Sequence, residues 1–287
     1  MKTVLGLICS PRRLGNAELM IGEIDRQIPE PHRLRLLRLS DFRLRPCRAC
    51  YLCLFKKENC VLQDDLSLIL DALSGADGLI WAVPAYFLSA NSALKKLVDR
   101  GLSFYGRIDS LWGKPSVGVA IAGIPGKEGS TLTDIHRCLA FMGADIKALT
   151  TLYAALPGEI LQDETNRQIA SHLGSALFGR PLERDAPACP QCGGTAFQFA
   201  SDGSVHCLVC SNAGTMTVEN NRPRFDIQQD NHPLFRTKED ALRHRDWLRQ
   251  EVKRFGQQRE ALQNLRNVSK PQGEWIKPAT GLKESEN

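Results

Sequence analysis

The sequence lacks any apolar run approaching the roughly 20 residues that a membrane-spanning helix requires. Its first apolar run, residues 3–8, ends at Ser10-Pro11-Arg12-Arg13 without the small-residue cleavage site of a signal peptide. A short, continuous apolar run is typical of a parallel strand that is buried on both faces. We therefore interpret the segment as a buried first strand and expect a cytoplasmic protein with no membrane partner.

Common nucleotide-binding and hydrolytic motifs are also missing. The chain has neither a Walker loop nor a Gly-x-Gly-x-x-Gly run, which disfavours ATP and a Rossmann-type NAD site. Its six histidines are scattered, and the sequence contains no Ser–His–Asp or paired-carboxylate arrangement. We therefore assign no catalytic side chain.

Neither positive nor negative charge is in large excess. Lys and Arg exceed Asp and Glu only slightly, 37 against 32, which gives a formal net charge of +5. A strong basic stripe and a platform of aromatic side chains are typical of nucleic-acid-binding surfaces, and the sequence has neither. A nucleic-acid partner is therefore not expected.

Cysteine, in contrast, is abundant. Of the ten cysteines, eight fall into two tight groups, within residues 47–60 and 189–210. In a reducing compartment, closely spaced thiols bind metals rather than form disulfides. The sequence thus predicts two metal sites. Cys9 and Cys138 lie at apolar positions of an expected strand and helix, and we interpret them as packed hydrophobic residues.

Residues 1–180 alternate between strand-like and helix-like patterns. Apolar or alternating runs are separated by segments with the spacing of amphipathic helices. The strands are expected at residues 3–8, 33–39, 78–83, 116–122 and 148–153. This alternation predicts a doubly wound α/β domain with a parallel sheet, in which ligands bind beyond the carboxyl ends of the strands.

The composition changes after Arg180. Residues 181–220 contain Pro, Gly, Ser and four Cys with little helical pattern, so we expect a separate small domain there. Residues 221–287 form a C-terminal extension. The run that begins at Thr237 resembles a capping box and predicts one helix over about residues 237–267, followed by a loose tail.

The loop after the first strand, residues 10–17, has the features of a phosphate site. It leads from a strand into a helix, so a phosphate would meet free N–H groups and the positive end of the helix dipole. Arg12 and Arg13 supply positive charge, and Gly15 permits a tight turn before the Asn16 cap. A plain strand–helix turn with two solvated arginines is the alternative.

Two further loops are suited to a flat aromatic ligand. Residues 83–91 place Tyr86 and Phe87 at the carboxyl end of the third strand, where an aromatic wall and backbone amides suit an isoalloxazine ring. The loop after the fourth strand is rich in glycine, and Gly123 would let the backbone approach such a ring. The alternative is that the two aromatic residues pack beneath their own loop.

Together these motifs resemble the NADPH-dependent FMN reductase family, and more narrowly its iron–sulfur flavoprotein branch. The resemblance covers residues 1 to about 180. It rests on the Ser-Pro-Arg loop ending in Gly15-Asn16, the cysteine group ahead of Asp64-Asp65, and the Pro-Ala-Tyr-Phe loop ahead of residues 94–100. It implies a flavodoxin-like fold with a five-stranded parallel sheet in the order 2-1-3-4-5, bound FMN, and a homo-oligomer, either a dimer or a tetramer.

The resemblance also implies that residues of the 10–17 loop surround the FMN phosphate and that Pro84, Tyr86 and Phe87 surround the ring. Combined with the loop features, the expected cofactor-binding residues are Ser10, Arg12, Arg13, Gly15, Asn16, Ala17, Pro84, Ala85, Tyr86, Phe87 and Gly123. The family usually has Thr or Ser at position 17. Ala17 removes one hydroxyl donor, which should weaken phosphate binding without abolishing it.

The first cysteine group, Cys47-x2-Cys50-x2-Cys53-x6-Cys60, supplies four thiols in one loop. A [4Fe-4S] cubane needs four thiolates, and this compact spacing is unusual for zinc, whose sites generally use two separated pairs. The resemblance indicates the same cluster. The loop follows the second strand, so a cluster there could pass single electrons to FMN. A zinc ion, or no metal at all, is the alternative.

The second group consists of the pairs Cys189-x2-Cys192 and Cys207-x2-Cys210, with fourteen residues between them. Two separated Cys-x2-Cys pairs are the spacing of a zinc ribbon. A rubredoxin-like single iron is the alternative at these four residues. Four cysteines complete a tetrahedron, so we do not expect the neighbouring His206 to be a ligand.

These features predict an FMN-dependent oxidoreductase or electron carrier in which a [4Fe-4S] cluster and FMN exchange electrons. Its redox partner would be ferredoxin or NAD(P)H. The first alternative is an NAD(P)H-dependent FMN or quinone reductase without a cluster. An alternative of another class is a zinc-ribbon binding protein that senses redox state.

Overall fold

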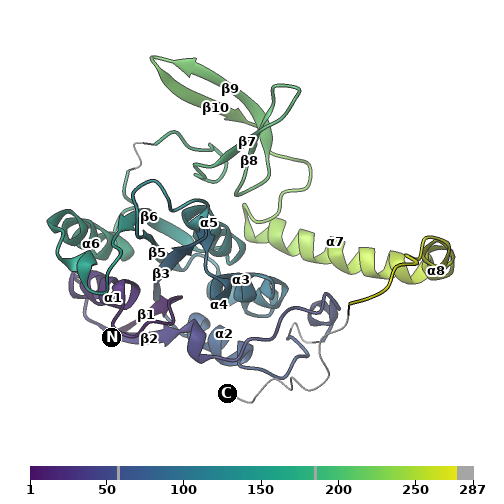
Figure 1. Ribbon diagram of the computed structural model, residues 1–287, viewed down its shortest axis with the longest axis horizontal. Coiled ribbons are helices and arrows are strands. Elements are labelled where there is room, and N and C mark those ends of the chain that lie inside the picture. The colour runs from purple at the N-terminus through teal and green to yellow at the C-terminus, as the bar shows by residue number, and fades with distance from the viewer. Residues whose placement is uncertain (57–58, 184–185, 277–287) are drawn as a thin grey trace. The chain divides into compact units, whose positions relative to one another are not determined.

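A parallel sheet forms the core of the first part of the chain, between residues 2 and 153 (Figure 1). The computed structural model describes residues 1–56, 59–183 and 186–276, and the chain divides into two units, residues 1–247 and 248–287. The parallel strands are β1 (Lys2–Ile8), β2 (His32–Arg38), β3 (Gly78–Tyr86), β5 (Pro115–Ala122) and β6 (Asp145–Tyr153). They pair in the order β2-β1-β3-β5-β6, which confirms the flavodoxin-like order 2-1-3-4-5.

The sheet contains one strand that the sequence did not predict. β4 (Ser89–Ala90) pairs antiparallel with the end of β3, through Ala85 opposite Ala90 and Tyr86 opposite Ser89. The sheet therefore has six strands rather than five. A strand of two residues is too short to show an apolar pattern in the sequence. It forms only because the loop after β3 folds back.

Helices cover both faces of the sheet (Figure 1). The helices α1 (Asn16–Arg26) and α6 (Glu164–Leu177) share one core with the sheet, and α2 (Leu66–Ser74), α3 (Ser92–Val98) and α5 (Thr131–Phe141) share the other. A short α4 (Ile108–Leu111) precedes β5. Along β3, Trp81 and Val83 enter one core while Ile80 and Ala82 enter the other. This double burial explains the continuous apolar runs of the parallel strands.

Short 3-10 turns connect several of these elements. Their bounds are Leu39–Asp41, Leu52–Leu54, Gly101–Arg107 and Glu159–Leu161. Among the described residues, no helix is long and apolar enough to span a bilayer.

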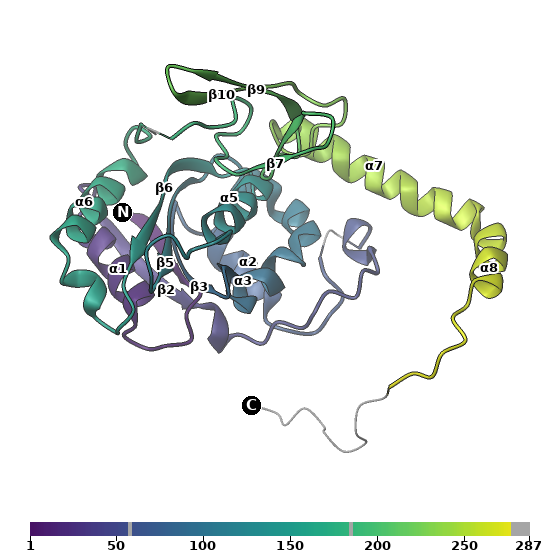
Figure 2. The ribbon, with the colours of Figure 1, turned by 45° about the horizontal axis from the view of Figure 1, so that its top comes forward.

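A second, antiparallel sheet comes next along the chain, drawn in green in Figure 2. Its strands are β7 (Phe197–Phe199), β8 (Val205–Cys207), β9 (Ala213–Glu219) and β10 (Arg222–Ile227), in the order β10-β9-β8-β7. We call residues 189–227 the ribbon. It extends past the expected boundary at residue 220 because β9 and β10 form a hairpin. Asn220 and Asn221 at its turn have φ values of 51° and 61°, as in two-residue hairpin loops.

The C-terminal segment contains two helices where the sequence predicted one. They are α7 (Lys238–Gln257) and α8 (Arg259–Val268), and the break falls at Gln258. Gly256, two residues earlier, weakens the helix at this point because glycine loses the most backbone entropy on ordering. Of the expected loose tail, residues 277–287 lie outside the described residues.

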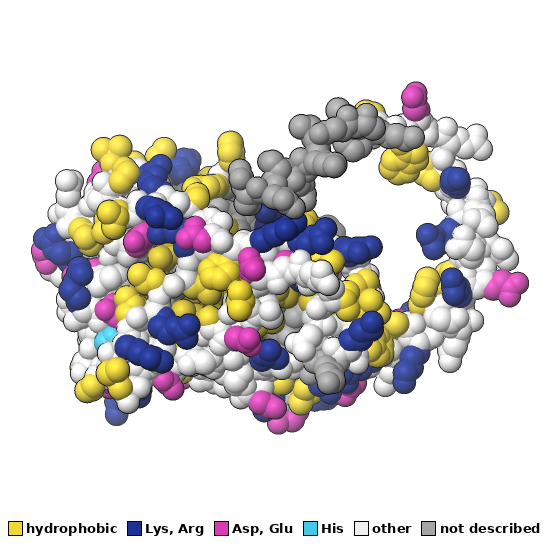
Figure 3. Space-filling model, turned by 90° about the horizontal axis from the view of Figure 1, so that it is seen from below, with side chains coloured by type: hydrophobic (Ala, Val, Ile, Leu, Met, Phe, Trp, Pro, Cys, Tyr) yellow, Lys and Arg dark blue, Asp and Glu magenta, His cyan; other side chains and the backbone are white. Residues whose placement is uncertain are grey.

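On the face shown in Figure 3, basic and acidic side chains are intermixed with hydrophobic ones. This agrees with the nearly balanced charge of the sequence.

Candidate functional site

Loops at the carboxyl edge of the parallel sheet enclose a cavity of about 180 Å³. Of the eleven predicted cofactor-binding residues, all but Arg13 and Phe87 line this cavity. Three lining residues were not predicted: Ile121, Ala154 and Ala155. They lie at or just beyond the ends of β5 and β6, where the carboxyl-edge rule would have found them.

The 10–17 loop leads directly into α1, with Gly15 as the residue before the helix. No side chain caps this helix, so its first N–H groups are available to an anion. Arg12 and Ser10 both line the cavity, and the Ser10 hydroxyl accepts a hydrogen bond from the Arg12 amide (3.2 Å). The hydroxyl proton of Ser10 is therefore left to donate. These groups together form a cradle suited to a phosphate.

Arg38, at the end of β2, holds this loop from outside the cavity. Its Nη1 donates to the carbonyls of Ser10 (3.2 Å) and Arg12 (2.9 Å). Its Nη2 donates to the Glu18 carboxylate (2.6 Å), which also accepts from the Leu14 amide (2.7 Å). Hydrogen bonding from Arg38 lowers the pKa of the Glu18 carboxyl. No sequence signal indicates this role, because Arg38 is one of several arginines on an edge strand.

Asn16 lines the cavity, but its side chain bonds to the neighbouring loop. Its Nδ2 donates to the Ala154 carbonyl (3.2 Å), and its Oδ1 accepts from the Gly158 amide (2.9 Å). Asn16 therefore joins the loops after β1 and β6. Since Ala17 has no side-chain donor, a phosphate here would depend on backbone amides, Ser10 and Arg12.

The segment Tyr86-Phe87-Leu88, which we call the ring loop, presents apolar surface beside the cavity. The Phe87 side chain is fully exposed, and those of Tyr86 and Leu88 are about half exposed. Phe87 therefore does not pack beneath its own loop. The φ values of Phe87 and Leu88 are 49° and 63°, an uncommon and costly conformation outside glycine that gathers at functional sites.

The ring loop is also held by close packing. The Leu88 carbonyl accepts from the Ser130 amide (2.8 Å). Gly129, with a φ of 55°, lies so close that a Cβ atom there would be 1.9 Å from the Leu88 oxygen. Only glycine fits at this position, which makes the loop after β5 part of the support of the ring loop.

The first cysteine group lies in the loop between β2 and α2. Cys47 and Cys50 are exposed, and Cys53 and Cys60 are partly buried. Among the described residues, these thiols do not form a group of three or more ligands within 4.8 Å of one another. They are therefore not gathered around a single ion. A cubane binds each thiolate through a different iron and so needs a wider spacing.

A buried ion pair anchors the same loop. Arg100 and Asp64 are 2.7 Å apart, with side chains that are 1% and 0% exposed. The Asp64 carboxylate also accepts from the amides of Arg45 (2.9 Å) and Leu66 (3.2 Å). Burial opposes ionisation of Asp64, but the hydrogen bonds from Arg100 and the two amides outweigh it and lower the pKa of the carboxyl. Arg100 also donates to the Arg45 carbonyl (2.8 Å), so the pair fixes the chain just ahead of Cys47.

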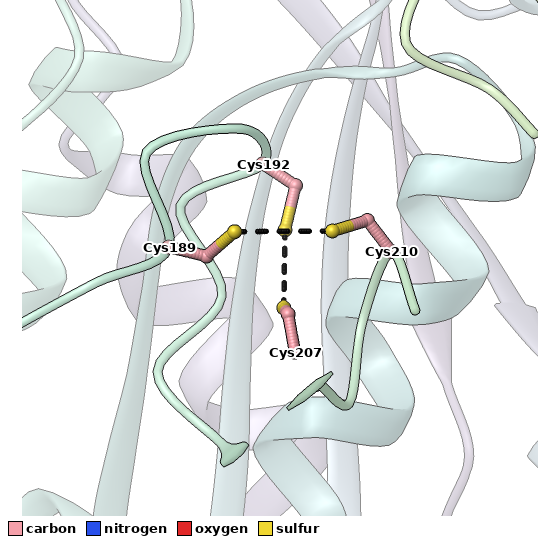
Figure 4. Close-up of side chains that lie close together, drawn as sticks. All are labelled: Cys189, Cys192, Cys207 and Cys210. Atoms are coloured by element: carbon pink, nitrogen blue, oxygen red, sulfur yellow. Dashed lines mark hydrogen bonds between the residues drawn. The ribbon is translucent and has the colours of Figure 1, made fainter. Parts of the chain in front are cut away.

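The sulfur atoms of the second cysteine group lie close together. Figure 4 shows the sulfurs of Cys189, Cys192, Cys207 and Cys210 turned toward one another. All four lie within 4.8 Å, with separations of 3.8 Å between Cys189 and Cys210 and 3.5 Å between Cys192 and Cys207. A tetrahedral ion with metal–sulfur bonds of about 2.3 Å separates its sulfurs by about 3.8 Å. The group thus has the dimensions of a single-ion site.

The protein supports this site with backbone donors. The amides of Gly194 and Val209 each donate to a ligand sulfur, Cys192 and Cys207 respectively, at 3.4 Å. Hydrogen bonding among the four thiols lowers the pKa of Cys189 and Cys207 and raises the pKa of Cys192 and Cys210, so the group titrates as a unit. His206 is not among the gathered side chains, and its Nε2 lies 3.4 Å from the Ser204 hydroxyl.

Comparison with known proteins agrees with this architecture. Residues 2–157, more than half of the chain, match the sequence model of the NADPH-dependent FMN reductase family. An iron–sulfur flavoprotein of Methanocaldococcus jannaschii is 37% identical over 99 residues, which are 34% of this chain and 50% of that protein. An iron–sulfur flavoprotein of Methanosarcina thermophila is 29% identical over 142 residues, 49% of this chain and 74% of that protein. The chain thus spans about half of the length of the first relative.

Solved structures show the same fold. A flavone reductase aligns with a TM-score of 0.72 at 18% identity, over 96% of this chain and 100% of that chain. An NAD(P)H:quinone oxidoreductase from Methanothermobacter marburgensis aligns with a TM-score of 0.50 at 18% identity, over 64% of this chain and 99% of that chain. The likeness to the first structure extends beyond the sheet into the region of the ribbon.

Proposed function

Because the chain belongs to the NADPH-dependent FMN reductase family, we propose that the cavity at the carboxyl edge of its sheet binds FMN and that the protein is a flavin-dependent oxidoreductase or electron carrier. The observation that carries this proposal is the convergence of nine of the eleven predicted residues on one cavity. They come from three loops that are far apart in the sequence.

The residues divide between the two ends of FMN. The phosphate would lie on the first amides of α1, with Ser10 donating its hydroxyl proton and Arg12 supplying charge. The ring would lie against Pro84, Ala85 and the ring loop, whose exposed aromatic side chains can cover its apolar surface. FMN supplies the redox chemistry, and the protein binds and orients it.

We further propose that Cys47, Cys50, Cys53 and Cys60 hold a [4Fe-4S] cluster. Among the described residues these thiols do not form a close single-ion group, and curated relatives of this chain are iron–sulfur flavoproteins. The loop begins beyond the carboxyl end of β2, on the sheet edge that carries the cavity. Electrons from ferredoxin or NAD(P)H would then pass between the cluster and the flavin.

At Cys189, Cys192, Cys207 and Cys210 we propose zinc. The sulfur separations suit one tetrahedral ion, and the two separated pairs have zinc-ribbon spacing. In the proposed assembly the protein is a cytoplasmic homo-oligomer, a dimer or a tetramer. The exposed apolar ring loop offers contact surface for a second copy.

A reductase without a cluster is the second candidate. The matched family model, that of NADPH-dependent FMN reductases, favours it. Steady turnover of NADPH by the purified protein would support this candidate. Reduction by ferredoxin or dithionite alone would support the cluster-containing electron carrier.

The deciding experiment is anaerobic purification followed by iron, sulfide, zinc and FMN analysis with an absorption spectrum. We expect about four iron, four sulfide, one zinc and one FMN per chain. FMN and zinc without sulfide, in protein never exposed to air, would establish the reductase without a cluster. If no flavin binds after reconstitution, the proposed function is wrong.

A further inference from the structure

The ring loop depends on one carboxylate of α5. The Asp134 Oδ2 accepts hydrogen bonds from the Ser89 hydroxyl (2.9 Å), the Ala90 amide (3.0 Å) and the Ser130 hydroxyl (3.0 Å). Ser89 and Ala90 form β4, which directly follows the ring loop. Asp134 thus fixes the point at which the strained backbone of Phe87 and Leu88 returns to the sheet.

The same helix holds the ribbon, one turn further along. Arg137 donates from Nε to the Leu208 carbonyl (2.5 Å) and from Nη1 to the other Asp134 oxygen, Oδ1 (3.3 Å). Leu208 lies between Cys207 and Cys210, in the turn that carries two of the gathered thiols. Asp134 therefore accepts from β4, which follows the ring loop, on one oxygen. On the other it accepts from Arg137, which also contacts the metal-binding turn.

Two more contacts make α5 the support of the ribbon. The His136 Nε2 lies 3.1 Å from the Cys192 carbonyl, and Ala140 packs against the small apolar core of the ribbon. That core has only five buried residues, so it needs a bound metal to keep its shape. Without the metal, the turn that carries the Leu208 carbonyl is no longer held in place through Cys207 and Cys210.

We propose that Arg137 and Asp134 are positioning residues that couple the ribbon metal to the ring loop. The proposal rests on the proposed function, because it concerns the same flavin cavity. Metal binding fixes the Leu208 carbonyl, this carbonyl orients Arg137, and Arg137 holds Asp134 where it accepts from β4. Loss of the metal weakens this chain of contacts, and the strained ring loop relaxes away from the shape that binds FMN. By linkage, FMN raises the zinc affinity by the same factor.

The test measures the FMN dissociation constant and the hydrogen exchange of the Ala90 amide, each with zinc bound and after chelation. In the wild-type protein we expect zinc removal to weaken FMN binding about fivefold, the low end of the usual range, because Arg137 is about one-third exposed. The Ala90 amide should exchange faster. In Arg137→Ala the zinc-loaded protein should already show both changes, and chelation should add little.

Arg107→Ala is the matched control. It removes an arginine that pairs with Asp71 on another part of the surface, so its response to chelation should equal that of the wild-type protein. The proposal is overturned if chelation changes neither FMN binding nor Ala90 exchange in the wild-type protein. It is also overturned if chelation has the same effect in Arg137→Ala as in the wild-type protein.

The two readouts separate this proposal from the proposed function. If FMN binds to no form of the protein, the proposed function fails, and Ala90 exchange alone decides the coupling. Zinc-loaded Arg137→Ala guards against unfolding of the zinc-free ribbon, since its metal site is intact. Unchanged Ala90 exchange in that variant would also overturn the proposal.

Discussion

The two cysteine groups contain four thiols each, yet they are arranged differently. The thiols of the ribbon lie within 4.8 Å of one another, and hairpin turns and backbone amides hold them there. The thiols of the 47–60 loop do not gather in this way, and two of them are exposed. The ribbon thiols surround a space that fits one ion, whereas the 47–60 loop is anchored ahead of Cys47 and leaves its thiols apart. Two separated Cys-x2-Cys pairs thus indicate a single-ion site, and the compact group in the loop does not form one.

Of the changes that test this contrast between the two cysteine groups, removal of a ribbon thiol should have the largest effect. Cys192→Ser should abolish zinc binding and unfold the ribbon, because structural zinc contributes about 10–16 kcal/mol to small domains. Metal analysis and limited proteolysis measure the two effects. Iron and sulfide contents should stay as in the wild-type protein. His206→Ala is the control, and zinc loss in that variant would contradict the assigned ligand set.

The corresponding change in the first cysteine group is Cys60→Ser. We expect it to lower the iron and sulfide contents by more than half, because a cubane needs four ligands. Zinc should remain stoichiometric, since the ribbon site does not depend on this loop. Metal analysis and visible absorption after anaerobic purification test both statements. If zinc falls together with iron, the two sites are not independent.

The ion pair between Arg100 and Asp64, which anchors the 47–60 loop, can be removed without changing a cysteine. Asp64→Asn leaves the buried Arg100 without its counter-charge and should cost about 3–5 kcal/mol of unfolding free energy. Urea unfolding measures this cost. Asp71→Asn is the matched control, because its pair with Arg107 is exposed and should contribute at most about 1 kcal/mol.

The Asp64 contribution should depend on pH. Its pKa is lowered in the folded state, so its stabilisation is fully present above the unfolded value of about 3.9 and is lost as the pH falls through the folded pKa. The stability difference between the wild-type protein and Asp64→Asn should therefore be constant near neutrality and shrink below about pH 4. A difference that grew on acidification would contradict the assigned ion pair.

The smallest expected effect is at the 10–17 loop, where we propose that the FMN phosphate binds. Ala17→Ser restores a hydroxyl donor beside the cavity and should tighten FMN binding about two- to tenfold, the worth of one hydrogen bond. Titration monitored by flavin fluorescence measures the change. Ala17→Val is the control, because it adds bulk without a donor. Equal affinities for Ala17→Ser and the wild-type protein would place residue 17 outside the phosphate site.

Local pattern and the topology of parallel sheets were enough to predict the alternation of strands and helices and the sheet edge at which the cavity lies. The strand order was implied by the family resemblance and was confirmed, and Ser10, Gly15, Pro84 and Gly123 meet in one cavity because each lies at or beyond the carboxyl end of a strand. Contacts between segments that are far apart in the sequence were not predictable. Arg38 supports the 10–17 loop across 26 residues, and the pattern of its own strand does not indicate this.

Other differences have the same origin. Asp134 supports β4 from 44 residues away, and β4 exists only through that tertiary contact and its pairing with β3. The break between α7 and α8 was missed because an apolar stripe can continue across a weak point in a helix. Periodicity therefore indicates which face of a helix is apolar, but it does not always indicate where the helix ends.

The arrangement of β2 also has a consequence for how this protein behaves at high concentration. A strand at the edge of a sheet exposes unpaired amides and carbonyls that can recruit another chain and start aggregation. β2 lies at one edge and carries Arg33 and Arg35 along it, and these charges discourage a second strand from docking. At the other edge the Leu182 amide bonds to the Lys147 carbonyl (3.0 Å), so the chain itself occupies one pairing position of β6. Charge along one edge and this backbone contact on the other thus oppose uncontrolled extension of the sheet.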